Sequence, residues 1–427
     1  MLGCGNVGAA LIALVGERAD EIAGRTGVRL EVTRVAVRSL ARNRPVDLAD
    51  EVFTRDAPEV VADPDVDVVV EAIGGIEPAR ELILAALANG KPVVTANKEL
   101  LANHGAEIFD AASAAGVDLL FEAAVGGGIP IMRPLRESLV GEDVRRIMGI
   151  VNGTTNFILT RMSEDGTSYI KALGEAQQLG YAERDPTADV DGLDAGAKAA
   201  ILASIAFGAK VVAGDVYHEG ISAVGPTDIA FAARLGYTIK LLAVAELVPV
   251  AGEADHVAVR VHPAMVPTEH PLAGVRDSFN AVFVEGTAVG DLMFYGRGAG
   301  GGPTASAVLG DLVDAAVNLR QGTRGQIVAL HPRPIRAIDE LRSGYYVNLD
   351  VVDRPGVLRA IAEAFERHAV SIRSLEQEGA GDAARLIFIT HEAREADVQH
   401  TLDDLRDLDV ILDITSVLRV VGEPDAR

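Results

Sequence analysis

The stretch LGCGNVGAALIALV (Leu2–Val15) sets three glycines, Gly3, Gly5 and Gly8, in a G-x-G-x-x-G pattern directly before an apolar run. This spacing is typical of the turn between the first strand and first helix of a dinucleotide-binding fold. The first glycine allows a tight turn, the second leaves bare backbone for a pyrophosphate, and the third lets helix and strand pack closely. The apolar run predicts a helix to about Ala23, whose first amide groups are free to bind phosphate. Only two residues precede the first glycine, so we expect either a truncated first strand or an unusually short central strand.

Short apolar segments alternate with helical patterns through the first third of the chain. Strands are predicted at Leu30–Val37, Val66–Ile73, Pro92–Ala96 and Val117–Val125, and helices at Pro78–Asn89 and Glu99–Ala115. Nearly continuous apolar strands separated by helices are typical of a parallel sheet covered on both faces. The predicted fold class is therefore α/β, with a Rossmann-type nucleotide domain first.

Composition narrows the range of partners. The 427 residues suffice for two or three domains, and the formal net charge of −23 disfavours binding to nucleic acid or to anionic membrane surfaces. A single cysteine, Cys4, excludes an intrachain disulfide and a multi-cysteine metal site. The longest apolar stretch, Ala199–Ala209, is shorter than the ~20 residues that span a bilayer. We expect a cytoplasmic protein with small-molecule partners and neither nucleic acid nor membrane among them.

The second predicted strand ends in basic rather than acidic residues. Arg38 follows Val37 directly, and Arg42 and Arg44 lie nearby. A carboxylate at this place would repel a ribose 2′-phosphate, whereas a guanidinium can clamp it with paired hydrogen bonds. We therefore expect NADP as the cofactor, with NAD as the alternative. The arginines could instead belong to a solvated loop.

Four segments in the middle of the chain carry clustered polar and glycine residues. They are VVTANKELL (Val93–Leu101), FEAAVGGGIPI (Phe121–Ile131), GIVNGTTNFIL (Gly149–Leu159) and LGYAERDPTADVDGLDAGAKAAIL (Leu179–Leu202). In the last, Asp194 and Lys198 are four residues apart and share one face of the predicted helix. An ammonium oriented by a carboxylate can exchange a proton with a carbonyl oxygen, so we expect Lys198 to be a general acid/base. An ordinary salt bridge on a solvated face is the alternative.

The four segments, in this order behind the G-x-G-x-x-G, resemble homoserine dehydrogenases. The signature of that family is matched by Ala176, Gly180, Tyr181, Asp185, Pro186, Asp189, Gly192, Asp194 and Lys198, and the resemblance extends to about Gly322. It implies the reversible NAD(P)H-dependent reduction of L-aspartate 4-semialdehyde to L-homoserine, a step in threonine, methionine and isoleucine biosynthesis.

The resemblance also implies a set of site residues. Lys198, Asp194 and Lys98 would be catalytic, and Glu183, Asp194 and Lys98 would bind the substrate, with Glu183 on its α-ammonium group. The dinucleotide would contact Gly3, Gly5, Asn6, Val7, Gly8, Arg38, Lys98, Gly180 and Gly300. A sodium ion would be held, largely through backbone oxygens, at Glu122, Val125, Gly127 and Ile129, and hard oxygen ligands suit such an ion.

The C-terminal part has its own pattern. Strand and helix signals from Tyr345 to Val421 follow a β-α-β-β-α-β order, which is the ferredoxin-like arrangement. The turn Asp353–Leu358, with sequence DRPGVL, resembles ACT domains, which bind amino acids. The resemblance implies feedback inhibition by L-threonine, with Gly356 allowing close approach of the effector. A domain that only dimerises is the alternative.

These patterns divide the chain into four parts. We expect a nucleotide domain at 1–128, completed by about 296–320, an α+β substrate and dimerisation domain at 129–295, a linker at 321–343 and an ACT domain at 344–422. Within the second part, strands are predicted at His256–Val261 and Ala281–Val289, and the helix after Thr304 should return to the nucleotide domain. We expect a homodimer or homotetramer.

Two rival functions stay open. One is a nicotinamide enzyme that acts on a related amino-acid aldehyde. The other is a non-catalytic amino-acid sensor, which the truncated first strand would favour.

Overall fold

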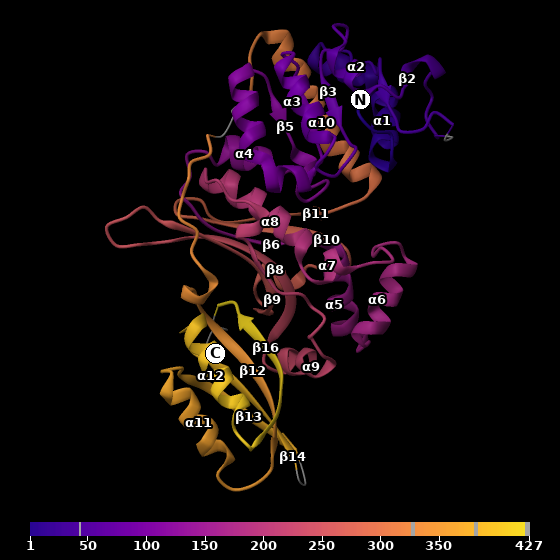
Figure 1. Cartoon of the computed structure of the whole chain (residues 1–427). Coiled ribbons are helices and arrows are strands. Elements are labelled where there is room, and N and C mark those ends of the chain that lie inside the picture. The colour runs from indigo at the N-terminus through magenta and orange to yellow at the C-terminus, as the bar shows by residue number, and fades with distance from the viewer. Residues whose placement is uncertain (42–43, 326–328, 380–382, 423–427) are drawn as a thin grey trace.

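The computed structural model describes residues 1–41, 44–325, 329–379 and 383–422. Figure 1 shows three parts in succession: a nucleotide-type part at the N-terminus, a central sheet with helices, and a C-terminal part at the opposite end. The α/β fold class with a C-terminal ferredoxin-like unit is confirmed. Among the described residues, no helix has the length and apolar character needed to cross a membrane.

The N-terminal sheet is parallel, as predicted, but its strands are short. It consists of β3 (Val69–Glu71), β4 (Val93–Thr95) and β5 (Leu119–Leu120), beside a pair formed by β1 (Val35–Ala36) and β2 (Phe53–Thr54). Fully buried Leu2 forms parallel bridges with both Ala36 and Glu71 and so joins the two groups. The short first strand therefore occupies the central position of the sheet.

The four strands predicted for this part are all longer than the observed ones, and the structure shows the reason for two of them. The strand predicted at Leu30–Val37 is limited to β1, because the N-terminal segment beside it offers few residues for pairing. Ala36 N donates to Met1 O, and Gly3 N donates to Ala36 O. The strand predicted at Val117–Val125 ends at Leu120. The chain then turns into a 3₁₀ helix at Glu122–Ala124, whose first amide donates to Asp311.

Helices cover this sheet. They are α1 (Asn6–Thr26), α2 (Ala57–Ala62), α3 (Ala79–Ala88), α4 (Lys98–Ala115) and, from much later in the chain, α10 (Gly301–Gln321). Figure 1 shows α10 next to α1, and apolar side chains of both helices share one core. In α10 the chain thus returns to the N-terminal part and packs against α1.

A large sheet forms the middle of the molecule. Its strand order begins β11 (Gly290–Arg297), β10 (Phe279–Gly286), β6 (Val144–Ile150), β8 (Tyr237–Val248) and β9 (His256–Pro267), with β7 (Tyr217–His218) beside β9. The strand predicted at Ala281–Val289 is wrong beyond Gly286, because the chain turns there and returns as the edge strand β11, which the sequence did not reveal.

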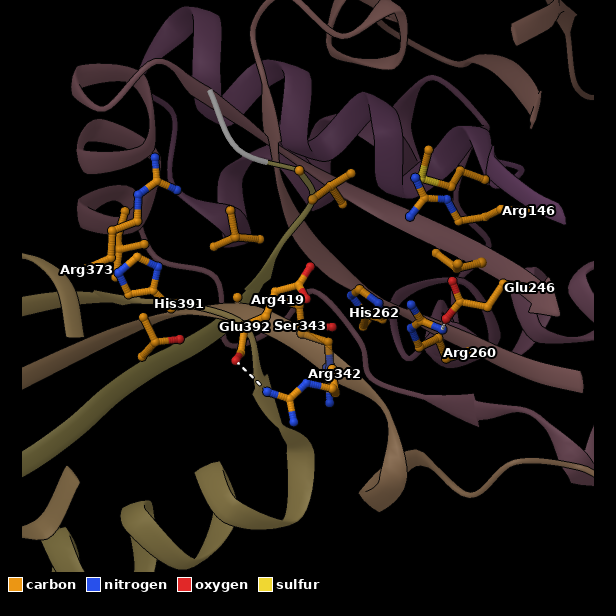
Figure 2. A pocket seen from close by; sticks show the side chains of 18 residues that line it. Arg146, Glu246, Arg260, His262, Arg342, Ser343, Arg373, His391, Glu392 and Arg419 are labelled. Carbon is orange, nitrogen blue, oxygen red and sulfur yellow. Dashed lines mark hydrogen bonds and ion pairs between the residues drawn. The ribbon is translucent and has the colours of Figure 1, made fainter. Parts of the chain in front are cut away.

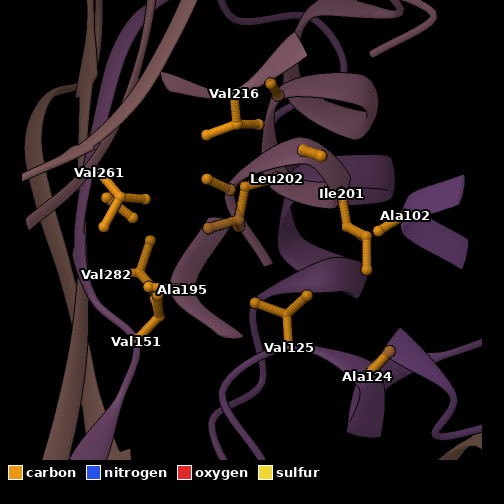
Figure 3. Close-up of a cluster of buried hydrophobic side chains, with 14 of the residues drawn as sticks. Ala102, Ala124, Val125, Val151, Ala195, Ile201, Leu202, Val216, Val261 and Val282 are labelled. Atoms are coloured by element: carbon orange, nitrogen blue, oxygen red, sulfur yellow. The ribbon is translucent and has the colours of Figure 1, made fainter. Parts of the chain in front are cut away.

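Helix α8 (Leu193–Phe207) lies between this sheet and the nucleotide part. Figure 3 shows Ala195 and Leu202 of α8 toward Val261 and Val282 of the sheet, while Ile201 faces Ala102 of α4. The other helices of this part are α5 (Gly153–Asp165), α6 (Tyr169–Gln178), α7 (Thr187–Val190) and α9 (Pro226–Arg234). Short 3₁₀ turns lie at Asp50–Val52, Ala213–Asp215, Pro271–Gly274 and Ile338–Glu340, and a π-helical turn at Pro134–Ser138.

The C-terminal unit has the predicted β-α-β-β-α-β order, with one extra two-residue strand. Its elements are β12 (Arg342–Val352), α11 (Val357–Arg367), β13 (Ile372–Gly379), β14 (Ala383–Thr390), β15 (Ala393–Arg394), α12 (Glu395–Arg406) and β16 (Ile411–Val420). Strand β16 pairs in parallel with β9, with Arg419 opposite Ala264 and Val420 opposite Met265. The central sheet therefore continues into the C-terminal unit.

Candidate active site

Two lysines and one aspartate meet where α4 and α8 approach each other. Lys98 is the first residue of α4, directly after β4, and so lies at the carboxyl end of the parallel sheet, where ligands bind in such folds. Asp194 and Lys198 lie on the first two turns of α8. One oxygen of Asp194 pairs with Lys98, and the other accepts a hydrogen bond of 2.7 Å from Lys198. The structure thus brings together the three residues predicted to be catalytic.

Lys198 is held deep in this cluster and Lys98 at its surface. The side chain of Lys198 is 11% exposed, whereas that of Lys98 is 44% exposed. Lys198 Nζ also donates to the main-chain oxygen of Val151, at 2.6 Å, which fixes its direction. Burial lowers the pKa of Lys198, and the charge of Asp194 opposes this effect. Such an amine can release and regain a proton nearer to neutral pH than a free lysine.

The carboxylate of Asp194 stays charged at all physiological pH values. Burial by itself raises the pKa of this carboxyl group, but the positive charges of Lys198 and Lys98 outweigh burial and hold the pKa well below its usual range. Asp194 can therefore orient both ammonium groups without exchanging a proton itself.

Asn152 is a member of this cluster that the sequence analysis did not single out. Its Oδ1 caps α5 by accepting from Thr155 N at 2.9 Å. Its Nδ2 donates to Asp189 at 2.7 Å and to Asp194 at 2.9 Å, so one amide bridges two carboxylates. Burial raises the pKa of Asp189, and the bond from Asn152 opposes that rise. The polar turn in GIVNGTTNFIL was the signal for the cap, but not for the bridge.

Glu183 and Gly180 lie on the exposed loop between α6 and α7. Among the described residues, none makes a hydrogen bond or ion pair with the carboxylate of Glu183, so the structure does not join it to the lysine cluster. The loop is attached to α5, because Thr154 Oγ1 donates to the main-chain oxygen of Tyr181 at 2.7 Å. Gly180 has a positive φ of +76° at the turn that ends α6.

The glycines of the G-x-G-x-x-G occupy the positions that a dinucleotide cradle requires. A Cβ on Gly3 would lie 2.6 Å from Ala72 O, and one on Gly8 would lie 2.8 Å from Gly3 O. A Cβ on Gly5 would have no neighbouring atom within 4 Å, so the backbone at this position is open. Gly5 also precedes the first residue of α1 and has no side chain to cap the helix. The first amide groups of α1 are therefore available to a ligand. A hollow of about 360 Å³ opens here beside Asn6. These residues fit a bound dinucleotide.

Other predicted cofactor residues border the same region. Gly300 caps α10 with a φ of +118°, and a Cβ on its neighbour Gly301 would lie 3.3 Å from Asn6 O, which brings the two helix starts together. Val7 belongs to the first turn of α1. Arg38 is exposed just after β1, whereas Arg44 lines the hollow. Arg42 lies outside the described residues.

The loop predicted to bind sodium presents main-chain oxygens. In the described part of the chain, no group of three or more His, Cys, Asp or Glu side chains is arranged to hold a metal ion. The carboxylate of Glu122 accepts from the main-chain amides of three residues, Ile131, Met132 and Arg133. Within the described ranges, no backbone amide or side chain donates to the main-chain oxygens of Val125, Gly127 and Ile129. Such oxygens are suitable ligands for a hard monovalent cation.

The predicted effector site lies at the start of α11. Gly356 caps this helix with a φ of +96°, a conformation that favours glycine. A hollow of about 410 Å³ lies between this turn and strands β12, β13 and β14.

Three parts of the chain match models of known protein families. Residues 3–122 match the family model described as "Homoserine dehydrogenase, NAD binding domain", residues 130–313 that of homoserine dehydrogenase, and residues 345–410 that of the ACT domain. The chain is 49% identical over 429 residues to a homoserine dehydrogenase of Mycobacterium tuberculosis, covering 99% of this chain and 97% of the relative. It is 51% identical over 421 residues to one of Corynebacterium glutamicum, covering 98% and 94%.

Two solved structures are similar over large parts of the chain. The crystal structure of a homoserine dehydrogenase from Thiobacillus denitrificans has a TM-score of 0.91 at 40% identity and covers 98% of this chain and 97% of its own. A hyperthermophilic archaeal homoserine dehydrogenase in complex with NADPH has a TM-score of 0.62 at 30% identity, covering 74% and 96%.

Proposed function

Because the chain belongs to the homoserine dehydrogenase family, we propose that it reduces L-aspartate 4-semialdehyde to L-homoserine, reversibly, at the cluster of Lys98, Asp194 and Lys198. The observation that carries the proposal is the position of this cluster. It lies at the carboxyl end of the parallel sheet and is built from both the nucleotide-type part and the central part. The product would enter threonine, methionine and isoleucine biosynthesis.

Lys198 is the proton donor in this scheme. A reduced nicotinamide, when bound, would supply the hydride for the aldehyde carbon, and the carbonyl oxygen would then need a proton as its π electrons move onto it. Lys198 gives that proton and recovers it in the oxidation of homoserine. Its bonds to Asp194 and to Val151 O hold the ammonium group in one direction, so little reorganisation precedes the transfer. Hydride plus proton converts aldehyde to alcohol and balances the reaction.

Lys98 and Glu183 position the substrate. The more exposed Lys98 stabilises negative charge on the reacting oxygen or on the substrate carboxylate, while Asp194 holds it in place. Glu183 binds the substrate's α-ammonium group. Its loop is attached to α5 through the bond from Thr154 to Tyr181 O and a ring contact between Tyr181 and Phe157, while Glu183 itself stays exposed and accessible to a substrate.

NADP is the proposed cofactor, with NAD as the alternative. Arg38 follows β1 at the place where a ribose 2′-phosphate would lie, and it is exposed to solvent. The archaeal relative solved in complex with NADPH supports this choice. The pyrophosphate is bound by the glycine-rich turn and the start of α1, at Gly3, Gly5, Asn6, Val7 and Gly8. The dinucleotide also contacts Gly180 and Gly300.

A sodium ion is proposed to brace the loop between β5 and the π-helical turn. Val125, Gly127 and Ile129 would hold it through main-chain oxygens, together with Glu122. Its contribution is structural, because the loop borders α10 and therefore the cofactor region. Removal of sodium should loosen cofactor binding rather than remove the proton donor.

L-Threonine is the proposed effector, bound at the turn that contains Gly356. A route toward the cluster runs through Arg419 of β16, which pairs with Glu219 at 2.8 Å. Two residues after Glu219, Ile221 N donates to Val190 O at 2.9 Å. Val190 follows Asp189 in the chain, and Asn152 bridges Asp189 to Asp194. An effector that shifts β16 therefore acts on the catalytic carboxylates through contiguous contacts.

We propose a cytoplasmic homodimer or homotetramer.

The test is the decrease of absorbance at 340 nm with NADPH and L-aspartate 4-semialdehyde. Turnover of this substrate at least tenfold faster than that of related amino-acid aldehydes supports the proposal. Faster turnover of another aldehyde would favour the rival nicotinamide enzyme. Threonine binding without any NADPH oxidation would favour the sensor.

A further inference from the structure

A further cavity lies between the central sheet and the C-terminal unit. Its volume is about 140 Å³, and its walls come from β6, β8 and β9 on one side and from β12, β13, β14 and β16 on the other (Figure 2). None of the residues of the lysine cluster or of the Gly356 turn lines it. It is therefore separate from both sites proposed above.

Arginines dominate the wall of this cavity in a chain whose net charge is −23. The lining arginines are Arg146, Arg260, Arg342, Arg373 and Arg419, and the lining acidic residues are Glu246 and Glu392. Carboxylates behind the wall neutralise part of this charge, because Glu285 pairs with Arg146, while Glu219 and Glu395 pair with Arg419. The donors that face the cavity must therefore be considered one by one.

Arg260 and His262 offer the cavity a donor and an acceptor. Both lie on β9, two residues apart, so their side chains share one face of the sheet about 7 Å apart along the strand. Arg260 is 7% exposed, and its Nη1 donates to Glu246 at 2.6 Å, whereas its Nε has no partner among the described residues. His262 is 2% exposed, and its Nε2 is likewise without a partner in the described part of the chain.

The hydrogen-bonding role of His262 follows from its other nitrogen. Nδ1 lies 3.1 Å from Pro263 O, and a carbonyl oxygen can only accept, so we assign the proton to Nδ1. Burial, together with the charges of Arg419 and Arg260, lowers the pKa of His262 well below its usual value and keeps the ring neutral. Nε2 then carries the lone pair of a ring that lines the cavity (Figure 2).

We propose that this junction cavity binds a small oxyanion that carries its own hydroxyl group, with hydrogen phosphate as the simplest case. Its charged oxygens accept from Arg260 Nε and from the guanidinium of Arg342, which stands at the exposed mouth and already donates to Glu392 O at 3.0 Å. Its hydroxyl donates to His262 Nε2. A cavity of about 150 Å³ accommodates a molecule as large as benzene, so the volume suffices.

A bound anion would contact both walls and so fasten the C-terminal unit to the central sheet. A ligand that binds only the folded state raises the unfolding temperature, and above Kd the stabilisation grows with the logarithm of ligand concentration. The prediction is therefore measurable without knowledge of catalysis.

The experiment compares phosphate with sulfate at equal ionic strength and pH 7.5, by titration calorimetry and thermal unfolding of the full chain. Sulfate has the same shape and charge sign, but no hydroxyl at this pH. We expect phosphate to bind at least tenfold more tightly than sulfate and to raise Tm. Glycolate against acetate repeats the comparison for carboxylates, and the tighter of phosphate and glycolate identifies the source of the oxyanion.

Two variants locate the binding. His262→Phe keeps a ring of similar size but removes the lone pair, so it should reduce the preference for phosphate over sulfate to less than threefold. Arg342→Met, at an exposed position, should weaken both anions at least fivefold. Arg359→Met on α11, outside the cavity, is the matched control and should change neither. Absence of saturable phosphate binding, equal binding of both anions, or an undiminished preference in His262→Phe would overturn the proposal.

Discussion

Lys98 and Asp194, 96 residues apart in the chain, form an ion pair that joins the start of α4 to the start of α8. The second oxygen of Asp194 accepts from Lys198 at 2.7 Å, so one carboxylate orients two ammonium groups that enter from different parts of the molecule. This arrangement separates two roles. Lys198, buried against Val151 O, suits proton transfer, and the more exposed Lys98 suits contact with the substrate.

Removal of the charge on Asp194 should move the pH dependence of catalysis. Burial lowers the pKa of Lys198 and the charge of Asp194 opposes this, so Asp194→Asn should lower that pKa further. Reduction needs the protonated amine, and its rate should therefore begin to fall at a lower pH than in the wild type. Homoserine oxidation needs the neutral amine, and its rate should reach a plateau at a lower pH.

The measurement is the pH profile of kcat in both directions. Asp191→Asn, an exposed aspartate three residues earlier, is the control and should leave both profiles in place. Profiles for Asp194→Asn that coincide with the wild type after normalisation would show that this carboxylate does not act on the proton donor.

Asn152 should act as a positioning residue. In Asn152→Ala the bridge between Asp189 and Asp194 is lost, and two carboxylates are left close together without the amide between them. We expect kcat to fall about 10- to 100-fold, as for other residues that fix catalytic geometry, with the Kd for NADPH unchanged within twofold. Asn103→Ala, at an exposed site on α4, should have no effect. An unchanged kcat, or equal losses of kcat and NADPH affinity, would contradict this role.

Arg38 should decide between the two dinucleotides. Arg38→Ala removes the guanidinium at the end of β1 and should weaken NADPH binding at least tenfold, since a charge-assisted hydrogen bond contributes about 1.5–3 kcal/mol. NADH binding should stay within twofold, and Arg18→Ala on the exposed face of α1 should change neither. The measurement is fluorescence titration with both dinucleotides. Equal weakening of the two would mean that Arg38 does not contact the 2′-phosphate.

Glu219 should transmit the response to threonine. Glu219→Gln keeps the shape of the side chain but removes the charge that Arg419 pairs with across the domain junction. We expect maximal inhibition by L-threonine to fall by at least half, while kcat without threonine stays within twofold. Glu363→Gln on α11 is the control. Wild-type inhibition in Glu219→Gln would mean that the response follows another route. Absence of any threonine effect in the wild type would favour a C-terminal domain that only dimerises.

Local patterns in the sequence explain why much of this structure could be predicted. The turn at Gly3 and the start of α1 depend on residues that are adjacent in the chain, and the pairing of Asp194 with Lys198 needs only one helical turn. The order of elements in the C-terminal unit follows from hydrophobic periodicity and turn residues in the same way.

Contacts between elements that are distant in the sequence could not be predicted. Asn152 reaches Asp189 and Asp194 only because the start of α5 lies against α8, and its sequence context shows nothing beyond a cap. The edge strand β11 exposes Met293 and Tyr295, so its pattern lacks a buried face. The pairing of β16 with β9 joins residues more than 150 positions apart, and no local signal records it.

The most direct test of the account is the turnover of Lys198→Met with L-aspartate 4-semialdehyde and NADPH. Methionine keeps an unbranched chain but cannot donate a proton, so kcat should fall about 10²- to 10⁴-fold while the Kd for NADPH stays within twofold. Lys171→Met on the exposed face of α6 should retain wild-type kcat. A loss of less than tenfold in Lys198→Met, with the fold and NADPH binding intact, would contradict the assignment of Lys198 as the proton donor.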